Sequence, residues 1–179
     1  MQSLRLRIAF RLALVVAAGV ALAARAGAEP RKLSPADQNL VKNLAQSHVA
    51  GVKLGRLAAQ RGSNPAVKAF GQRVSQDRAT LITEMNMWAS SHQVALPTAI
   101  RPEQSAELKK LQGLSGPAFD QEYMRYALQA HRTDVTQLQQ GAQQAQDPNV
   151  QGLATKALPV LQGNLGAAQT VAAQVGVAP

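Results

Sequence analysis

The sequence contains no cysteine, and this absence sets the first limits on what the protein can be. No disulfide framework can hold the fold together, so a packed apolar core has to do so alone. No cysteine follows the amino-terminal apolar run either, which excludes a lipid-modified cysteine at a mature amino terminus.

Aromatic residues are also scarce, at 3% of the chain, and no stretch alternates between apolar and polar residues over the length of a strand. The chain is instead rich in alanine, leucine, valine and glutamine, a composition typical of helices packed closely through small side chains. Basic and aromatic residues are not interleaved, which argues against nucleic acid as a partner.

The residue patterns of common catalytic and metal sites are missing as well. The sequence has no Glu-x-x-His pair of the kind that di-metal helical bundles use. It has no serine paired with a histidine at a spacing that would activate a nucleophile. We therefore expect a protein that is not an enzyme and that carries no cofactor.

The first residues have the features of a secretory signal peptide. Three arginines precede an apolar run over residues 12–24, and the small residues Ala26 and Ala28 flank Gly27 as a cleavage signal. The apolar run is shorter than the roughly 20 residues that span a membrane. We expect removal of residues 1–28, export to the periplasm or the extracellular space, and one domain over residues 29–179 without a transmembrane span.

Three helix starts can be recognised from a capping residue followed by proline. They lie at Ser34-Pro35, Asn64-Pro65 and Asp147-Pro148. Apolar residues at helical spacing then predict four long helices, over residues 35–61, 65–92, 117–145 and 148–175. Pro159 lies inside the last of them and is expected to kink it or to split off its first turns.

The two halves of the chain look like a repeat, because Pro65 and Val67 are each followed 83 positions later by the same residue type. Each half contains a short hairpin turn, whereas the connection over residues 93–116 is long and includes a short helical stretch. Such a connection can cross the length of a helix of about 40 Å. The sequence therefore predicts an all-α, ferritin-like four-helix bundle with a crossover between its second and third helices.

A polar residue interrupts each apolar stripe near its middle. These residues, with two neighbouring acids, form a predicted mid-bundle polar layer: His48, Asp77, Arg78, His131, Asp134 and Asn164. A polar residue in a helix seam is usually a hydrogen-bonded core group. The alternative is a metal site built on His131 and Asp134, with His48 or Asp77 assisting, although the Arg78 charge would repel a metal ion there.

Arg78 itself should point into the bundle, since it lies between Val74 and Leu81 on the apolar stripe. A buried guanidinium requires a counter-charge. Asp77 points about 100° away around the helix. Asp134 lies at the same depth on the third long helix, so we predict an Arg78–Asp134 ion pair.

Lys42, Lys53 and Arg56 fall on one side of the first helix and form a predicted basic surface. They are either a solvated helix face or a patch for anionic envelope polymers or lipid headgroups.

Several segments of the chain resemble the bacterial exported domain-of-unknown-function 4142 family, from about residue 34 to 175. These segments are Leu54-Gly55-Arg56-Leu57-Ala58, the stretch from Ser63 to Phe70, the stretch from Gly116 to Tyr123, and Leu158-Pro159-x-Leu161. The resemblance implies an exported ferritin-like bundle without an assigned biochemical role. It also implies a glutamate at position 51 and histidines at positions 78, 131 and 164, of which this chain has only His131.

These observations favour an exported, non-catalytic four-helix bundle that acts as a binding or envelope-stress module. A degenerate metal-binding protein that uses His131 and Asp134 is the alternative. The sequence does not identify a partner.

Overall fold

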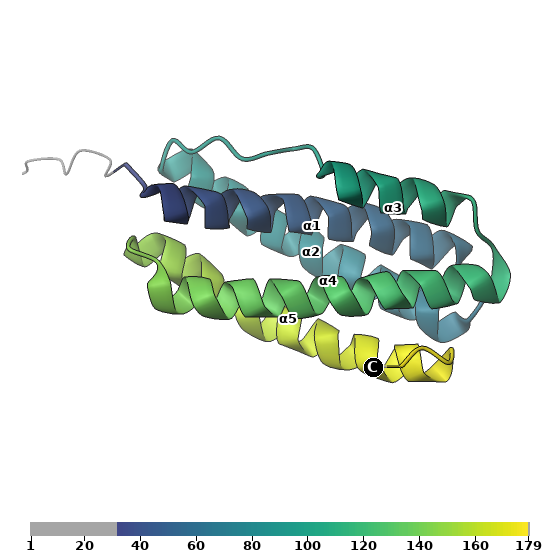
Figure 1. Ribbon diagram of the computed structural model, residues 1–179. Helices are drawn as coiled ribbons and strands as arrows, with labels where there is room; N and C mark the ends of the chain where they lie inside the picture. The colour runs from purple at the N-terminus through teal and green to yellow at the C-terminus, as the bar shows by residue number, and fades with distance from the viewer. Residues whose placement is uncertain (1–31, 179) are drawn as a thin grey trace, which may run out of the picture. The chain divides into compact units, whose positions relative to one another are not determined.

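The computed structural model describes residues 32–178, and the predicted signal peptide over residues 1–28 lies outside this range. All regular elements within the described residues are helices, which confirms the all-α prediction (Figure 1). In chain order they are α1 (Pro35–Arg61), α2 (Pro65–Ser91), α3 (Pro102–Gln112), α4 (Gly116–Gln144) and α5 (Pro148–Gln174). Within residues 32–178, no helix combines the length and the apolar character needed to cross a membrane.

The predicted caps start three of these helices. The side chain of Ser34 accepts a hydrogen bond from the backbone amide of Asp37, and Asn64 accepts one from Ala66. The side chain of Asp147 accepts from the backbone amides of Asn149 and Val150. In all three cases a proline follows, where its missing N–H leaves no hydrogen bond unmade.

The four long helices pair as two hairpins, α1–α2 and α4–α5 (Figure 1). Between the hairpins, α1 packs against α4 and α2 packs against α5. The start of α1 meets the end of α4, since Asp37 accepts hydrogen bonds from the amides of Gln146 and Asp147. Helices α1 and α4 are therefore antiparallel, and α2 and α4 run in the same direction.

The segment between α2 and α4 is the predicted crossover, and it carries α3 as its short helix. Helix α3 contacts α1 and α4. The ferritin-like arrangement is therefore confirmed.

The apolar core consists of two clusters, one toward each end of the bundle. The first contains Leu54, Phe70 and Tyr123, and the second contains Leu44, Leu81 and Leu161. The polar residues near the middle of the helices lie between them. The fold thus places these polar side chains away from bulk water, so that protein groups or enclosed water have to supply their hydrogen-bond partners.

Helix α5 runs without a break through Pro159, so the predicted splitting of its first turns is wrong. Pro159 is exposed. The carbonyl group that its missing N–H leaves free lies on the solvent side, where water can bind it.

Candidate functional site

The predicted polar layer is centred on Arg78 of α2, whose side chain is almost completely buried, with 2% exposed. Gly51 of α1 lies directly against it. A Cβ atom added at Gly51 would lie 2.8 Å from Cγ of Arg78. Any larger residue at this position would collide with the arginine, so Gly51 provides the room that the Arg78 side chain occupies.

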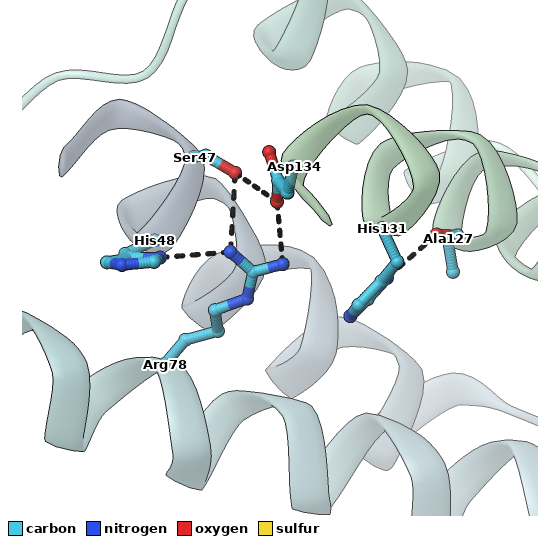
Figure 2. Close-up of polar contacts among 6 residues, drawn as sticks. All are labelled: Ser47, His48, Arg78, Ala127, His131 and Asp134. Atoms are coloured by element: carbon cyan, nitrogen blue, oxygen red, sulfur yellow. Dashed lines mark hydrogen bonds and ion pairs between the residues drawn. The ribbon is translucent and has the colours of Figure 1, made fainter. Parts of the chain in front are cut away.

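The guanidinium of Arg78 joins α1 to α4 (Figure 2). Its Nη2 donates to Oδ2 of Asp134 at 2.7 Å, which is the ion pair predicted from the sequence. Its Nη1 donates to Nδ1 of His48 at 2.9 Å and to the Ser47 hydroxyl at 3.4 Å. The Ser47 hydroxyl in turn donates to Oδ2 of Asp134 at 2.6 Å. We call these four residues, Ser47, His48, Arg78 and Asp134, the polar cluster.

The charges of the polar cluster stabilise one another. Burial raises the pKa of Asp134, but the Arg78 charge and the hydrogen bonds from Ser47 and Arg78 outweigh this and hold it below its ordinary value. Burial and the Arg78 charge lower the pKa of His48 to about 3. His48 is therefore neutral near pH 7, as it must be for Nδ1 to accept a hydrogen bond from an arginine.

His131 and Asn164 are buried as predicted but do not join the polar cluster. His131 donates from Nδ1 to the Ala127 carbonyl at 2.7 Å, and its ring packs against Phe70 with a centroid distance of 5.9 Å. Its Nε2 has no hydrogen-bond partner within the described residues. Asn164 is fully buried, and neither side-chain polar atom has a partner in residues 32–178.

The prediction that Asp77 belongs to the polar layer is wrong. It is only half-buried, and its carboxylate lies 3.6 Å from Nε of Arg73, one turn earlier on the surface of α2. The reason is helix geometry. The residue next to an inward-pointing Arg78 is rotated by about 100° and leaves the core face.

The buried donors and acceptors do not fit a metal ion. Oδ2 of Asp134 already accepts two hydrogen bonds, and the permanently charged guanidinium of Arg78 lies 2.7 Å from it. Nδ1 of His48 is engaged with Arg78, and Nε2 of His131, which has no partner within residues 32–178, is a single nitrogen and does not make a metal site by itself. No group of three or more histidine, aspartate or glutamate side chains in residues 32–178 is arranged to hold a metal ion.

A cavity of about 150 Å³ opens beside the polar cluster, lined by residues of α1, α2, α3 and α4. Arg78, His131 and Asp134 contribute to its wall, together with Tyr123 and Tyr126. This cavity could not be predicted from the sequence, because it depends on how α3 lies over α1 and α4.

The predicted basic surface is exposed. Lys42, Lys53 and Arg56 all point to solvent, and none of them forms an ion pair within the described residues. They lie on the outside of α1, away from the polar cluster.

Two further carboxylates act as caps that were not predicted from the sequence. Asp120 of α4 accepts hydrogen bonds from the backbone amides of Ser63 and Asn64, at 2.9 and 2.8 Å, and from the Ser63 hydroxyl. Asp37 of α1 accepts from the corresponding turn between α4 and α5, at 3.2 and 3.1 Å. Asp37 and Asp120 are 83 positions apart, so the repeat could have identified them as a pair.

Residues 22–171 match the family described as Domain of unknown function (DUF4142). The chain belongs to the DUF4142 family. This confirms the resemblance seen in the sequence. No curated protein matches this DUF4142 chain in sequence.

Several solved structures share its fold. A DUF305 fragment from Deinococcus radiodurans has a TM-score of 0.69 at 17% identity, and the match covers 79% of this chain and 98% of that one. A DUF305 protein from Streptomyces coelicolor, described as secreted, has a TM-score of 0.66 at 17% identity, with 80% and 95% covered. CopM in its Cu(II)-bound form has a TM-score of 0.64 at 16% identity, with 77% and 96% covered. At these identities the likeness establishes the fold alone.

Proposed function

We propose that this protein is an exported, non-catalytic binding module that docks the outer face of α1 on an anionic lipid surface of the cell envelope. Export is supported by the amino-terminal sequence and by the secreted Streptomyces relative. A non-catalytic role is supported by the polar cluster, whose ionised groups already satisfy one another.

The distribution of charge on α1 is the observation that carries this proposal. Its one acidic residue, Asp37, is 2% exposed and is used as a cap. Lys42, Lys53 and Arg56 are all exposed and have no acidic neighbour on the helix surface. A straight helix with positive charges on its outer side suits a flat anionic surface better than it suits a pocket-bound ligand.

The test is sedimentation with vesicles of phosphatidylglycerol and phosphatidylcholine. Each basic residue near such a surface contributes about 1 kcal/mol, so replacing Lys42, Lys53 and Arg56 with glutamine should weaken binding roughly 100-fold. Binding by the parent should also fall steeply with salt, because exposed charges are screened within about 8 Å at physiological ionic strength.

A matched control replaces three exposed basic residues on other helices, Lys68, Lys109 and Arg132, with glutamine. It has the same net charge and should bind like the parent. Equal loss in both triple variants would indicate a net-charge effect and contradict docking through α1. Binding of soluble polyglutamate without binding of vesicles would favour an anionic polymer instead.

Metal binding is the second candidate, and the Cu(II)-bound relative CopM is what brings it into consideration. The geometry does not favour it, because His48 and Asp134 are both committed to Arg78. Elemental analysis of natively purified protein, followed by a thermal-shift titration with Cu(II), tests whether the protein binds a metal. We expect no stoichiometric metal and no saturable stabilisation; one bound copper per chain would reverse this assignment.

A further inference from the structure

The cavity beside the polar cluster has room for a small molecule. Its volume of about 150 Å³ matches that of a cavity that binds benzene. Five apolar side chains from α1, α2 and α4 contribute to its wall: Ala50, Leu54, Val74, Ala127 and Ala130. A ligand with a small apolar body would give these side chains packing contacts that they lack on the cavity side.

Two polar side chains on the cavity wall each have one atom without a hydrogen-bond partner in residues 32–178. These atoms are Nε of Arg78 and Nε2 of His131. Both residues are deeply buried, with 2% and 4% exposed. Nε of Arg78 lies beside Gly51, another wall residue, since a Cβ atom added there would lie 3.2 Å from it. A bound polar group could supply the hydrogen bonds that these two atoms lack.

The two atoms have opposite hydrogen-bonding roles. Nε of Arg78 always carries a hydrogen and can only donate. Nδ1 of His131 donates to the Ala127 carbonyl, so Nε2 of the neutral ring is an acceptor. Burial and the Arg78 charge lower the pKa of His131 to about 4, so the ring is neutral near pH 7. The cavity therefore offers a ligand one donor and one acceptor.

The donor and the acceptor lie at the same level of the bundle. Asp134, which accepts from Arg78 at 2.7 Å, lies one helical turn after His131 on α4. Neighbours of this kind on a helix face are about 5–6 Å apart. Figure 2 shows Nε2 of His131 at the end of the ring away from Ala127, on the side where the Arg78 side chain lies. One small polar group can therefore reach both atoms.

The charges around the cavity indicate that this polar group is neutral. Asp134 is balanced by Arg78 at 2.7 Å, and Arg101 on the α3 side of the cavity is balanced by Glu103 at 2.6 Å. A carboxylate ligand would bring an unbalanced negative charge close to Asp134, and an ammonium ligand has no acceptor for Arg78. A carboxamide carries an acceptor and a donor side by side without a net charge.

We propose that this cavity binds a small neutral carboxamide. Its carbonyl oxygen accepts from Nε of Arg78, its N–H donates to Nε2 of His131, and its apolar body packs against the apolar wall between α1 and α4. The three basic residues of the lipid-docking proposal, Lys42, Lys53 and Arg56, do not line this cavity. Either proposal can therefore fail without the other.

The experiment is a two-dimensional NMR titration of the purified protein with isobutyramide at pH 7. We expect saturable shifts at residues around the cavity. Isopropyl methyl ketone has the same shape but no N–H, and should bind about fivefold more weakly because one hydrogen bond is lost. Isobutyrate, an anion at this pH, should bind more weakly than the ketone.

Three outcomes of this titration would overturn the proposal. Equal affinity for the amide and the ketone would remove the hydrogen bond to His131. Tighter binding of isobutyrate than of isobutyramide would contradict a neutral ligand. Absence of saturable shifts up to the solubility limit of isobutyramide would mean that the cavity holds water only.

Two variants test the position of the ligand. His131→Phe keeps a ring against Phe70 but removes the acceptor, so isobutyramide should bind about fivefold more weakly while ketone binding stays unchanged. Ala130→Leu places a larger side chain on the cavity wall and should weaken binding of both at least tenfold. Ala173→Leu, on the exposed surface of α5, is the matched control and should bind like the parent. Undiminished binding by a folded Ala130→Leu protein would contradict this position.

Discussion

The two hairpins, α1–α2 and α4–α5, are built from an 83-residue repeat, and they agree at their turns but differ at their centres. At the turns they are reciprocal. Asp120 from the second hairpin caps the turn of the first, and Asp37 from the first caps the turn of the second. Each hairpin therefore supplies the carboxylate that the other needs, which fixes how far each slides along its partner.

At the centre only the histidines correspond, His48 with His131. The counterpart of Asp134 is Gly51, and the counterpart of Arg78 is an apolar residue, Leu161. Asp134 comes from the second hairpin and Arg78 from the first. Gly51, which lies against Arg78, leaves room for the arginine side chain. The comparison shows that a repeat can keep its backbone caps while its buried charges diverge into a single asymmetric pair.

The distance between the two helices also differs from one hairpin to the other. In the first hairpin Gly55 and Gly71 face each other, and a Cβ atom at Gly71 would lie 2.6 Å from the Gly55 carbonyl oxygen. Their counterparts in the second hairpin are Leu138 and Ala154. The first hairpin thus approaches backbone to backbone, whereas the second is separated by side chains.

Breaking the Arg78–Asp134 pair should produce the largest change in the free energy of unfolding. Arg78→Met or Asp134→Leu alone leaves one buried charge without its partner and should lower the free energy of unfolding by about 3–5 kcal/mol. The double variant removes both charges and should recover much of that loss. Urea denaturation of the parent and the three variants measures this cycle. An Arg78→Met protein as stable as the parent would show that the pair is not important to the fold.

The reciprocal caps should be unequal, although they occupy equivalent positions. Asp120 accepts from two amides and a hydroxyl at short distances, whereas Asp37 accepts from two amides at longer ones. Asp120→Asn should lower the free energy of unfolding by about 3 kcal/mol, and Asp37→Asn by about 1.5 kcal/mol. Thermal and urea unfolding compare them, and the reverse order would contradict the geometric account.

The two histidines should make stability fall as the pH drops below 6.5. Burial and the Arg78 charge lower the pKa of His48 to about 3 and that of His131 to about 4, from 6.5 in the unfolded chain. The folded protein then binds fewer protons than the unfolded one, so acid favours unfolding. Each histidine should contribute about 2 kcal/mol between pH 6.5 and pH 5.

The measurement is urea denaturation at a series of pH values. Replacing either histidine with glutamine should remove about half of the slope, and the His131 contribution should level off first, near pH 4. An unchanged slope in both variants would mean that other groups govern the acid sensitivity.

The smallest expected change is an increase in the free energy of unfolding. Asn164 is buried with both polar atoms unsatisfied within the described residues, and its counterpart in the first hairpin is Leu81. Asn164→Leu replaces an unsatisfied amide with an apolar side chain of similar size and should raise the free energy of unfolding by about 1 kcal/mol. A rise in melting temperature checks this; a clear loss would indicate that Asn164 has a partner such as a buried water.

Most of the fold could be predicted from the sequence, because its signals are local. The caps at Ser34, Asn64 and Asp147 act within one helical turn, and the apolar periodicity follows from the geometry of a single helix. The length of the segment between α2 and α4 indicated the crossover. The Arg78–Asp134 pair was also within reach, since a buried charge needs a partner and only one acid lay at its depth and pointed inward.

Only the tertiary structure decided the contacts that depend on the rotation and separation of two helices. Ser47 joins the polar cluster because α1 is turned to place its hydroxyl 2.6 Å from Asp134, and a helical serine gives no sign of this in the sequence. The role of Gly51 depends on the Arg78 side chain of another helix, which lies directly against it. Asp120 reaches a turn more than fifty residues earlier, and the cavity depends on where α3 rests. Side-chain partners across a bundle depend on differences of an ångström, which residue spacing along one helix does not encode.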